Sequence, residues 1–99
     1  MLPGIKLFDL TDHVAVITGG SKGLGSAMAS GLASAGARVV LVSRHQSEVD
    51  EAAAEIAADF GVEAVGMEAD VSDQNQIGEV VQATIDRFGR IDALVNNAG

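Results

Sequence analysis

The feature that most constrains how this chain can fold is a glycine-rich segment, residues 18–25, which reads TGGSKGLG. The nearly apolar residues 13–17 predict a buried strand before it, and the small residues of 26–35 are compatible with a helix after it. At such a turn the helix N-terminus points free N–H groups and its positive dipole end at an anion, and glycines let a pyrophosphate approach the main chain. Residues 18–25 therefore predict a site for a phosphate-bearing ligand. A tight turn that merely contains glycines is the alternative.

The rest of the sequence alternates strands and helices at a spacing that fits the crossover units of a parallel sheet. Residues 39–42 are continuously apolar, which indicates a strand covered by helices on both faces. Gly31 lies inside the first expected helix at a cost of about 1 kcal/mol relative to Ala, so close contact with the sheet is the expected reason for it. We therefore expect an α/β fold. The expected strands are residues 13–18, 38–43, 62–68 and 91–95, and the expected helices are residues 23–35, 47–60 and 72–88.

Serines and glycines mark the ends of the predicted helices. Ser47 and Ser72 are suited to cap the second and third helices, and Gly36, Gly61 and Gly89 follow the last residues of the three. Each of the last two helices carries an apolar stripe at helical spacing. The expected stripe residues are Val49, Ala53, Ile56 and Phe60 in one helix, and Ile77, Val81, Thr84, Ile85 and Phe88 in the other.

Composition and charge argue against several classes of function. Hydrophobic residues make up 47% of the 99 residues, enough for a core. The net charge of −8 argues against nucleic acid or an acidic membrane as a partner, because both require a basic surface. Without Cys, and with only His13 and His45, neither disulfides nor a metal site are expected, and both histidines are interpreted as surface or strand-end residues. No apolar signal core or spanning segment is present, so a cytoplasmic protein is expected.

The end of the second expected strand lies about 20 residues beyond the glycine segment, where doubly wound folds recognise the adenosine ribose. The sequence there reads Ser43-Arg44-His45-Gln46 and contains no carboxylate. A carboxylate would bind the ribose hydroxyls and repel a 2′-phosphate, whereas a hydroxyl followed by Arg44 favours phosphate through charge-assisted hydrogen bonds. Lys22 adds a second positive charge nearby. We therefore predict NADP(H) rather than NAD(H) as the cofactor, with ordinary solvated charges at Lys22 and Arg44 as the alternative.

Three motifs together resemble the signature set of the short-chain dehydrogenase/reductase family. They are Thr18-Gly19-x-x-x-Gly23-x-Gly25, Asp70-Val71 and Asn96-Asn97-Ala98-Gly99. The resemblance covers nearly the whole chain and implies a Rossmann-like doubly wound parallel sheet, here its first half with strand order 3-2-1-4. Residues 1–12 are then expected to be an N-terminal lead-in. Residues 13–99 would form the dinucleotide-binding half of a domain that continues beyond them.

The resemblance also implies which residues contact the phosphates of the cofactor. The residues implied to line the pyrophosphate, chiefly through their backbone, are Gly19, Gly23, Leu24 and Gly25. Those implied near the adenosine phosphates are Ser21 and Lys22, with Ser43 and Arg44 at the 2′-position.

The adenine and ribose contacts are implied at the ends of the third and fourth strands. The Asp70 carboxylate would accept from the exocyclic amine of adenine, and the Val71 N–H would reach a ring nitrogen. A helix-cap role is the alternative for Asp70, and Asp92 is expected to close a turn. The residues implied near the ribose are Asn96, Ala98 and Gly99, and Asn96 or Asn97 would also tie down the central sheet.

The chemistry implied by the resemblance is hydride transfer, which in this family uses a Tyr acid/base, a Lys that lowers its pKa, and a Ser. This sequence contains no Tyr, and its two lysines, Lys6 and Lys22, come too early, so no catalytic residue is assigned. Strand 91–95 would leave a bare apolar edge. We therefore expect the N-terminal portion of a longer enzyme, inactive by itself. A short non-catalytic nucleotide-binding or scaffold protein is the alternative.

The resemblance therefore implies an NADP(H)-dependent oxidoreductase acting on a carbonyl or secondary alcohol. Within the family, the Ser43-Arg44 ending of the second strand is most similar to 3-oxoacyl and sugar-acid reductases, which gives the expected substrate type. A homo-oligomer, either a tetramer or a dimer, is expected for the complete protein, since family members commonly assemble in this way. No nucleic acid or membrane partner is expected. A sugar-nucleotide epimerase relative is a weaker alternative, because those proteins usually space the glycines differently and place an acid after the second strand.

Overall fold

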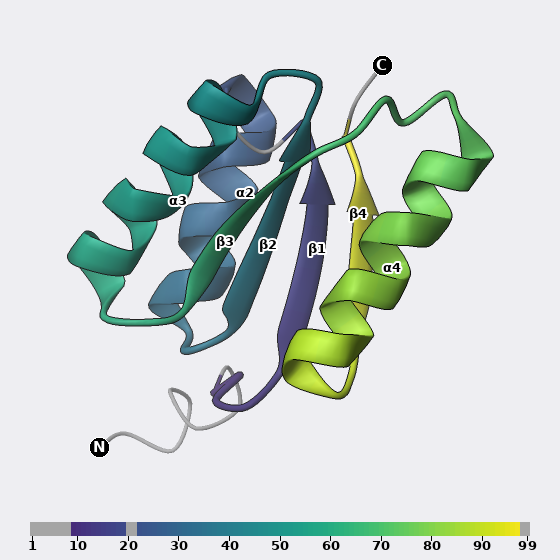
Figure 1. Ribbon diagram of the computed structural model, residues 1–99. Coiled ribbons are helices and arrows are strands. Elements are labelled where there is room, and N and C mark those ends of the chain that lie inside the picture. The colour runs from purple at the N-terminus through teal and green to yellow at the C-terminus, as the bar shows by residue number, and fades with distance from the viewer. Residues whose placement is uncertain (1–8, 20–21, 98–99) are drawn as a thin grey trace.

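The computed structural model describes residues 9–19 and 22–97 of the chain. Within them, four parallel strands form one sheet in the order β3-β2-β1-β4. In Figure 1, α2 and α3 lie on one face of this sheet and α4 lies on the other. This arrangement confirms the expected fold class and strand order. The elements are β1 (Val14–Thr18), α2 (Gly23–Ser34), β2 (Arg38–Ser43), α3 (Gln46–Phe60), β3 (Ala64–Glu68), α4 (Gln74–Phe88) and β4 (Ala93–Asn96).

The two central strands are buried on both faces, as their continuous apolar runs predict. Alternate side chains of a strand point to opposite faces of the sheet. Ile17 and Leu41 therefore join the core under α2 and α3. Val16 and Val40 join a second core that includes Val80 of α4. Each face thus has a separate aliphatic core, and both contribute to holding the loops at the strand ends.

β2 has the expected bounds, whereas β1, β3 and β4 each begin later than expected. His13 and residues 62–63 precede their strands, and β4 covers residues 93–96 instead of 91–95. Asp92 explains the late start of β4, because its Oδ2 accepts the Val14 N–H at 2.7 Å while its own N–H donates to the Val14 carbonyl at 2.8 Å. This residue therefore joins two chain segments that are far apart in the sequence, instead of closing a turn as expected.

Both expected serine caps are wrong. The N-cap residue of α3 is His45, without a side-chain capping bond, and α4 is capped by Asp73, whose Oδ1 accepts from the backbone N–H groups of Asn75 and Gln76. Ser72 instead donates to the Asp70 carboxylate. A carboxylate at the N-cap position also interacts favourably with the helix dipole, which a serine hydroxyl does less strongly.

The prediction that Gly31 lets α2 approach the sheet closely is also wrong. Gly31 is exposed, and a Cβ built there would meet nothing within 4 Å. Close approach occurs instead at Gly66 of β3, where a Cβ would lie 2.6 Å from the carbonyl carbon of Val49 in α3. Gly61 and Gly89, by contrast, end α3 and α4 in the left-handed conformation, with φ of 68° and 80°, as expected.

The apolar stripes are partly as expected. In α3, Val49, Ala53 and Ile56 are buried, but Phe60 is 37% exposed at the end of the helix. In α4, Thr84 is buried and Ile77, Val81 and Phe88 are half-buried, as expected. Val80, which lies outside the expected stripe, is also buried, and Ile85, which belongs to it, is 38% exposed.

Candidate cofactor site

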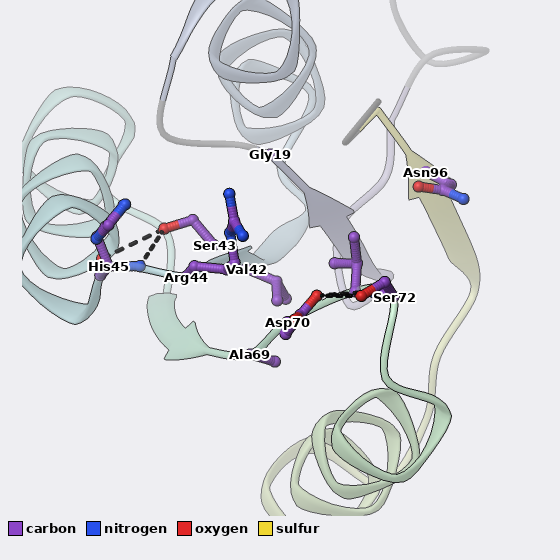
Figure 2. Close-up of a pocket in the computed structure, with 10 residues that line it drawn as sticks. Gly19, Val42, Ser43, Arg44, His45, Ala69, Asp70, Ser72 and Asn96 are labelled. Carbon is purple, nitrogen blue, oxygen red and sulfur yellow. Dashed lines mark hydrogen bonds between the residues drawn. The ribbon is translucent and has the colours of Figure 1, made fainter.

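The carboxyl ends of the four strands meet at one edge of the sheet, as parallel strands require. A hollow of about 560 Å³ opens there. Figure 2 shows its lining residues, with Gly19 across from Asp70 and Ser72, and with His45 and Asn96 at two further sides. Ligands of open α/β sheets bind at such an edge, beside the point where the strand order reverses. The lining residues are Gly19, Val42, Ser43, Arg44, His45, Ala69, Asp70, Val71, Ser72 and Asn96.

The glycine segment requires glycine at some positions for its backbone conformation and at another for lack of space. Gly19 and Gly23 have φ of 67° and 57°, in the left-handed region that side chains rarely adopt. Gly25, in the first turn of α2, has a steric requirement, since a Cβ there would overlap the Gly19 carbonyl oxygen and lie 2.8 Å from Asn97 Nδ2. The Gly19 N–H donates to the Val42 carbonyl at 2.7 Å. The backbone at this turn is therefore closely fitted between α2, β2 and the end of β4.

The end of β2 carries a hydroxyl and a cation. Ser43 Oγ accepts the His45 N–H at 3.1 Å and closes a short turn. Arg44 is exposed and lines the hollow, and none of the ion pairs found in the described parts of the chain involves it. Its guanidinium is therefore available to an anion that enters the hollow.

The end of β3 presents a carboxylate held by its own loop. Asp70 Oδ1 accepts from Ser72 N at 2.9 Å and from Ser72 Oγ at 2.7 Å, as the dashed line in Figure 2 indicates. These two hydrogen bonds, with a smaller contribution from the charge of Arg44, hold the pKa of the Asp70 carboxyl below its ordinary value. Asp70 is therefore ionised at neutral pH and can accept hydrogen bonds from a ligand.

The ends of β1 and β4 are joined by a buried threonine. Thr18 Oγ1 accepts the Asn97 N–H at 3.0 Å and donates to Asn96 Oδ1 at 3.0 Å. Both asparagines therefore help to hold β1 and β4 together, whereas the sequence led us to expect this of either Asn96 or Asn97. Asn96 also lines the hollow.

Of the sequence-predicted residues, the structure brings Gly19, Ser43, Arg44, Asp70, Val71 and Asn96 together at the hollow. Lys22 lies outside the hollow, where its Nζ is 3.3 Å from Glu48 Oε1 of α3 and its side chain is 76% exposed. Leu24 is also exposed, at 67%, and neither Gly23 nor Gly25 lines the hollow. The predicted residues Ser21, Ala98 and Gly99 lie outside the described residues.

Four lining residues were missed by sequence reasoning: Val42, His45, Ala69 and Ser72. Each is next to a predicted site residue in the sequence. The pattern that locates the strand ends would have identified them if one more residue on each side had been included.

Groups of three or more His, Cys, Asp or Glu residues suited to hold a metal do not occur in ranges 9–19 and 22–97.

The fold and this edge define a class before any relative is considered: a Rossmann-like parallel α/β sheet with a glycine turn beside the point where the strand order reverses. The sequence model of the family described as short chain dehydrogenase matches residues 13–99. The chain belongs to this family.

Individual relatives agree with this assignment. The 3-oxoacyl-[acyl-carrier-protein] reductase of Synechocystis sp. is 42% identical over 91 residues, which are 91% of this chain and 36% of that protein. L-sorbose reductase from Gluconobacter frateurii, solved in complex with NADPH and L-sorbose, superimposes with a TM-score of 0.89 at 41% identity, over 93% of this chain and 35% of that one. A metagenomic short-chain oxidoreductase in complex with NADP gives a TM-score of 0.86 at 42% identity, over 92% of this chain and 41% of that one. The chain thus spans little more than a third of the curated relative it matches.

Proposed function

We propose that this chain binds NADP(H) and forms the cofactor-binding part of an oxidoreductase acting on a carbonyl or secondary alcohol. The observation that carries the proposal is Arg44, an exposed guanidinium that lines the hollow at a strand end without a carboxylate. Guanidinium binds phosphate through paired, charge-assisted hydrogen bonds. The NADP(H) complexes among the structural relatives and the reductase names of several relatives support the same cofactor and reaction class.

The residues present fit such a cofactor, because Gly19 and Gly23, in the left-handed conformation, carry no side chain that would keep a pyrophosphate from the backbone. Arg44, together with Ser43, would hold the 2′-phosphate. When bound, NADPH would supply a hydride to the carbonyl carbon of a substrate. The remaining proposed contacts are Asp70 and Val71 on adenine, Asn96, Ala98 and Gly99 near the ribose, and Ser21, Lys22 and Leu24 beside the phosphates.

The test is the substitution Arg44→Ala, with Kd measured for NADPH and NADH. Loss of hydrogen bonds from a charged donor is expected to weaken NADPH about 10- to 100-fold, while the Kd for NADH changes by less than about two-fold, because NADH lacks the 2′-phosphate. Arg87→Ala is the control, since Arg87 is also an exposed arginine and lies in the last turn of α4, beside Glu63 and away from the hollow. Equal losses for both cofactors would contradict the assigned role of Arg44.

A non-catalytic nucleotide-binding protein is a second candidate, because the residues that line the hollow account for the binding of a nucleotide without assigning a chemical step. The two candidates differ in turnover. An oxidoreductase that contains this chain as its cofactor-binding part would oxidise NADPH when given a 3-oxoacyl thioester or a keto sugar, whereas a binding protein would retain NADPH unchanged with either.

A further inference from the structure

Gln76, on the first turn of α4, holds the loop that carries Asp70, although it does not line the hollow itself. The backbone N–H of Asp70 donates to Gln76 Oε1 at 2.7 Å, a partly buried hydrogen bond. It is formed between the end of β3 and the helix on the far side of the loop. A polar contact of this length to the backbone of a lining residue fixes where that residue lies.

The orientation of the Gln76 amide is fixed by the helix cap. Asp73 Oδ2 accepts from Gln76 Nε2 at 3.3 Å, while Asp73 Oδ1 accepts from the backbone N–H of Gln76 at 3.3 Å. Because the amide nitrogen faces a carboxylate, the amide oxygen must face the N–H of Asp70. The Asp73 N–H in turn donates to the Asp70 carbonyl at 3.0 Å. The cap of α4 therefore holds both backbone polar groups of Asp70.

The Asp70 side chain is held as well, but incompletely. Ser72 occupies Oδ1 through two hydrogen bonds. Among the residues that the structure describes, no group donates to Oδ2. One carboxylate oxygen is thus left for a ligand, at a position set by Ser72 and by the α4 cap.

We propose that Gln76 is a positioning residue for adenine recognition, which acts by placing the free oxygen of Asp70 toward the exocyclic amine of the base. The inference rests on the proposed function, because it requires an adenine nucleotide in the hollow. Gln76 then couples the helix cap at Asp73 to base selectivity, a role beyond the stability that any capping interaction provides.

The test compares NADPH with its hypoxanthine analogue, in which a carbonyl oxygen replaces the 6-amino group of adenine. The unmodified protein is expected to prefer NADPH by about tenfold or more, the value of one hydrogen bond to a charged acceptor. Gln76→Met keeps the side-chain length but removes the acceptor, and it is expected to reduce this preference at least about threefold. Gln82→Met is the matched control, because Gln82 lies in the same helix and donates to Asp86 at 2.9 Å instead of contacting the loop.

A purely structural role would weaken the binding of both nucleotides equally, and this result for Gln76→Met would overturn the inference. If Gln76→Met does not fold, Asp73→Ser decides, since serine can still cap α4 but leaves Gln76 Nε2 without its carboxylate partner. An unchanged preference in that variant would also overturn the inference. An unmodified protein that binds neither nucleotide would refute the proposed function itself, and one that binds both equally would refute the adenine contact of Asp70 on which the inference depends.

Discussion

Two glycines in the same helix offer a direct test of whether the turn before α2 requires close packing. Gly25 is buried at the first turn, and its Cβ would overlap the Gly19 carbonyl. Gly31 lies six residues later in an exposed position, where a Cβ would meet nothing within 4 Å. Replacing each by Ala therefore makes the same chemical change in the same helix, with and without a steric conflict.

The magnitude follows from two terms. Gly→Ala inside a helix stabilises by about 0.5 to 1 kcal/mol, and Gly31→Ala should gain this amount. Gly25→Ala gains the same term but adds overlap with backbone atoms, which cannot rotate away as a flexible side chain can. Overpacking of this kind costs about 1 to 3 kcal/mol. The free energies of unfolding of the two variants should therefore differ by about 1 to 3 kcal/mol, with Gly25→Ala the less stable.

The assay is thermal unfolding of both variants, followed by measurement of the Kd for NADPH. For a domain of this size, 1 kcal/mol corresponds to a shift in Tm of about 4 to 8 °C. Because Gly19 lines the hollow, displacement of its carbonyl by Gly25→Ala should also weaken NADPH, whereas Gly31→Ala should leave the Kd unchanged. Equal Tm values and equal affinities for the two variants would refute the packing argument.

Two further predictions concern charged groups. Glu48→Gln should release Lys22 toward the cofactor phosphates and tighten NADPH binding by up to about five-fold, the limit for an exposed ion pair. The control is Glu51→Gln, which removes a charge beside the same pair, and titration of NADPH into it should show a smaller gain in affinity. The pKa of Asp92 is lowered, chiefly by hydrogen bonds from Arg90, so its carboxylate contributes stability that is present above about pH 4 and lost as the pH falls further. The urea midpoint of unfolding should therefore fall less below about pH 4 in Asp92→Asn than in the unmodified protein. An equal fall in both would show that the Asp92 carboxylate does not contribute to this pH dependence.

Much of the site was predictable because it depends on the main chain. Gly19, Ser43, Asp70 and Asn96 were identified from a glycine turn and from three strand ends, and they line one hollow. Apolar runs locate parallel strands in the sequence, and the parallel sheet brings their carboxyl ends to one edge. A strand end that is located to within one residue is enough to place its loop at the site.

The choice of hydrogen-bond partner was less predictable. Ser72 and Asp73 are adjacent and both suited to cap a helix, and the sequence does not say which of them the neighbouring Asp70 will bind. Lys22 was expected beside the phosphates, but in the structure its long side chain pairs with Glu48, four residues beyond Arg44. Such contacts depend on side-chain directions in space, which residue spacing along the chain does not determine.

The site therefore combines two kinds of recognition that should respond differently to mutation. The turn at Gly19 is held by a backbone hydrogen bond and the Asp70 loop by the Gln76 side chain, so under the proposed function they should lose little conformational entropy on binding the cofactor. Arg44 and Lys22 are long, exposed side chains that, under the proposed function, the cofactor would have to order at a cost of up to about 2 kcal/mol each. Net binding of the 2′-phosphate is then a difference between strong contacts and this cost. Preference between NADPH and NADH should consequently change readily with single surface substitutions, whereas binding of the dinucleotide itself should be lost only when the backbone of the strand-end loops is displaced.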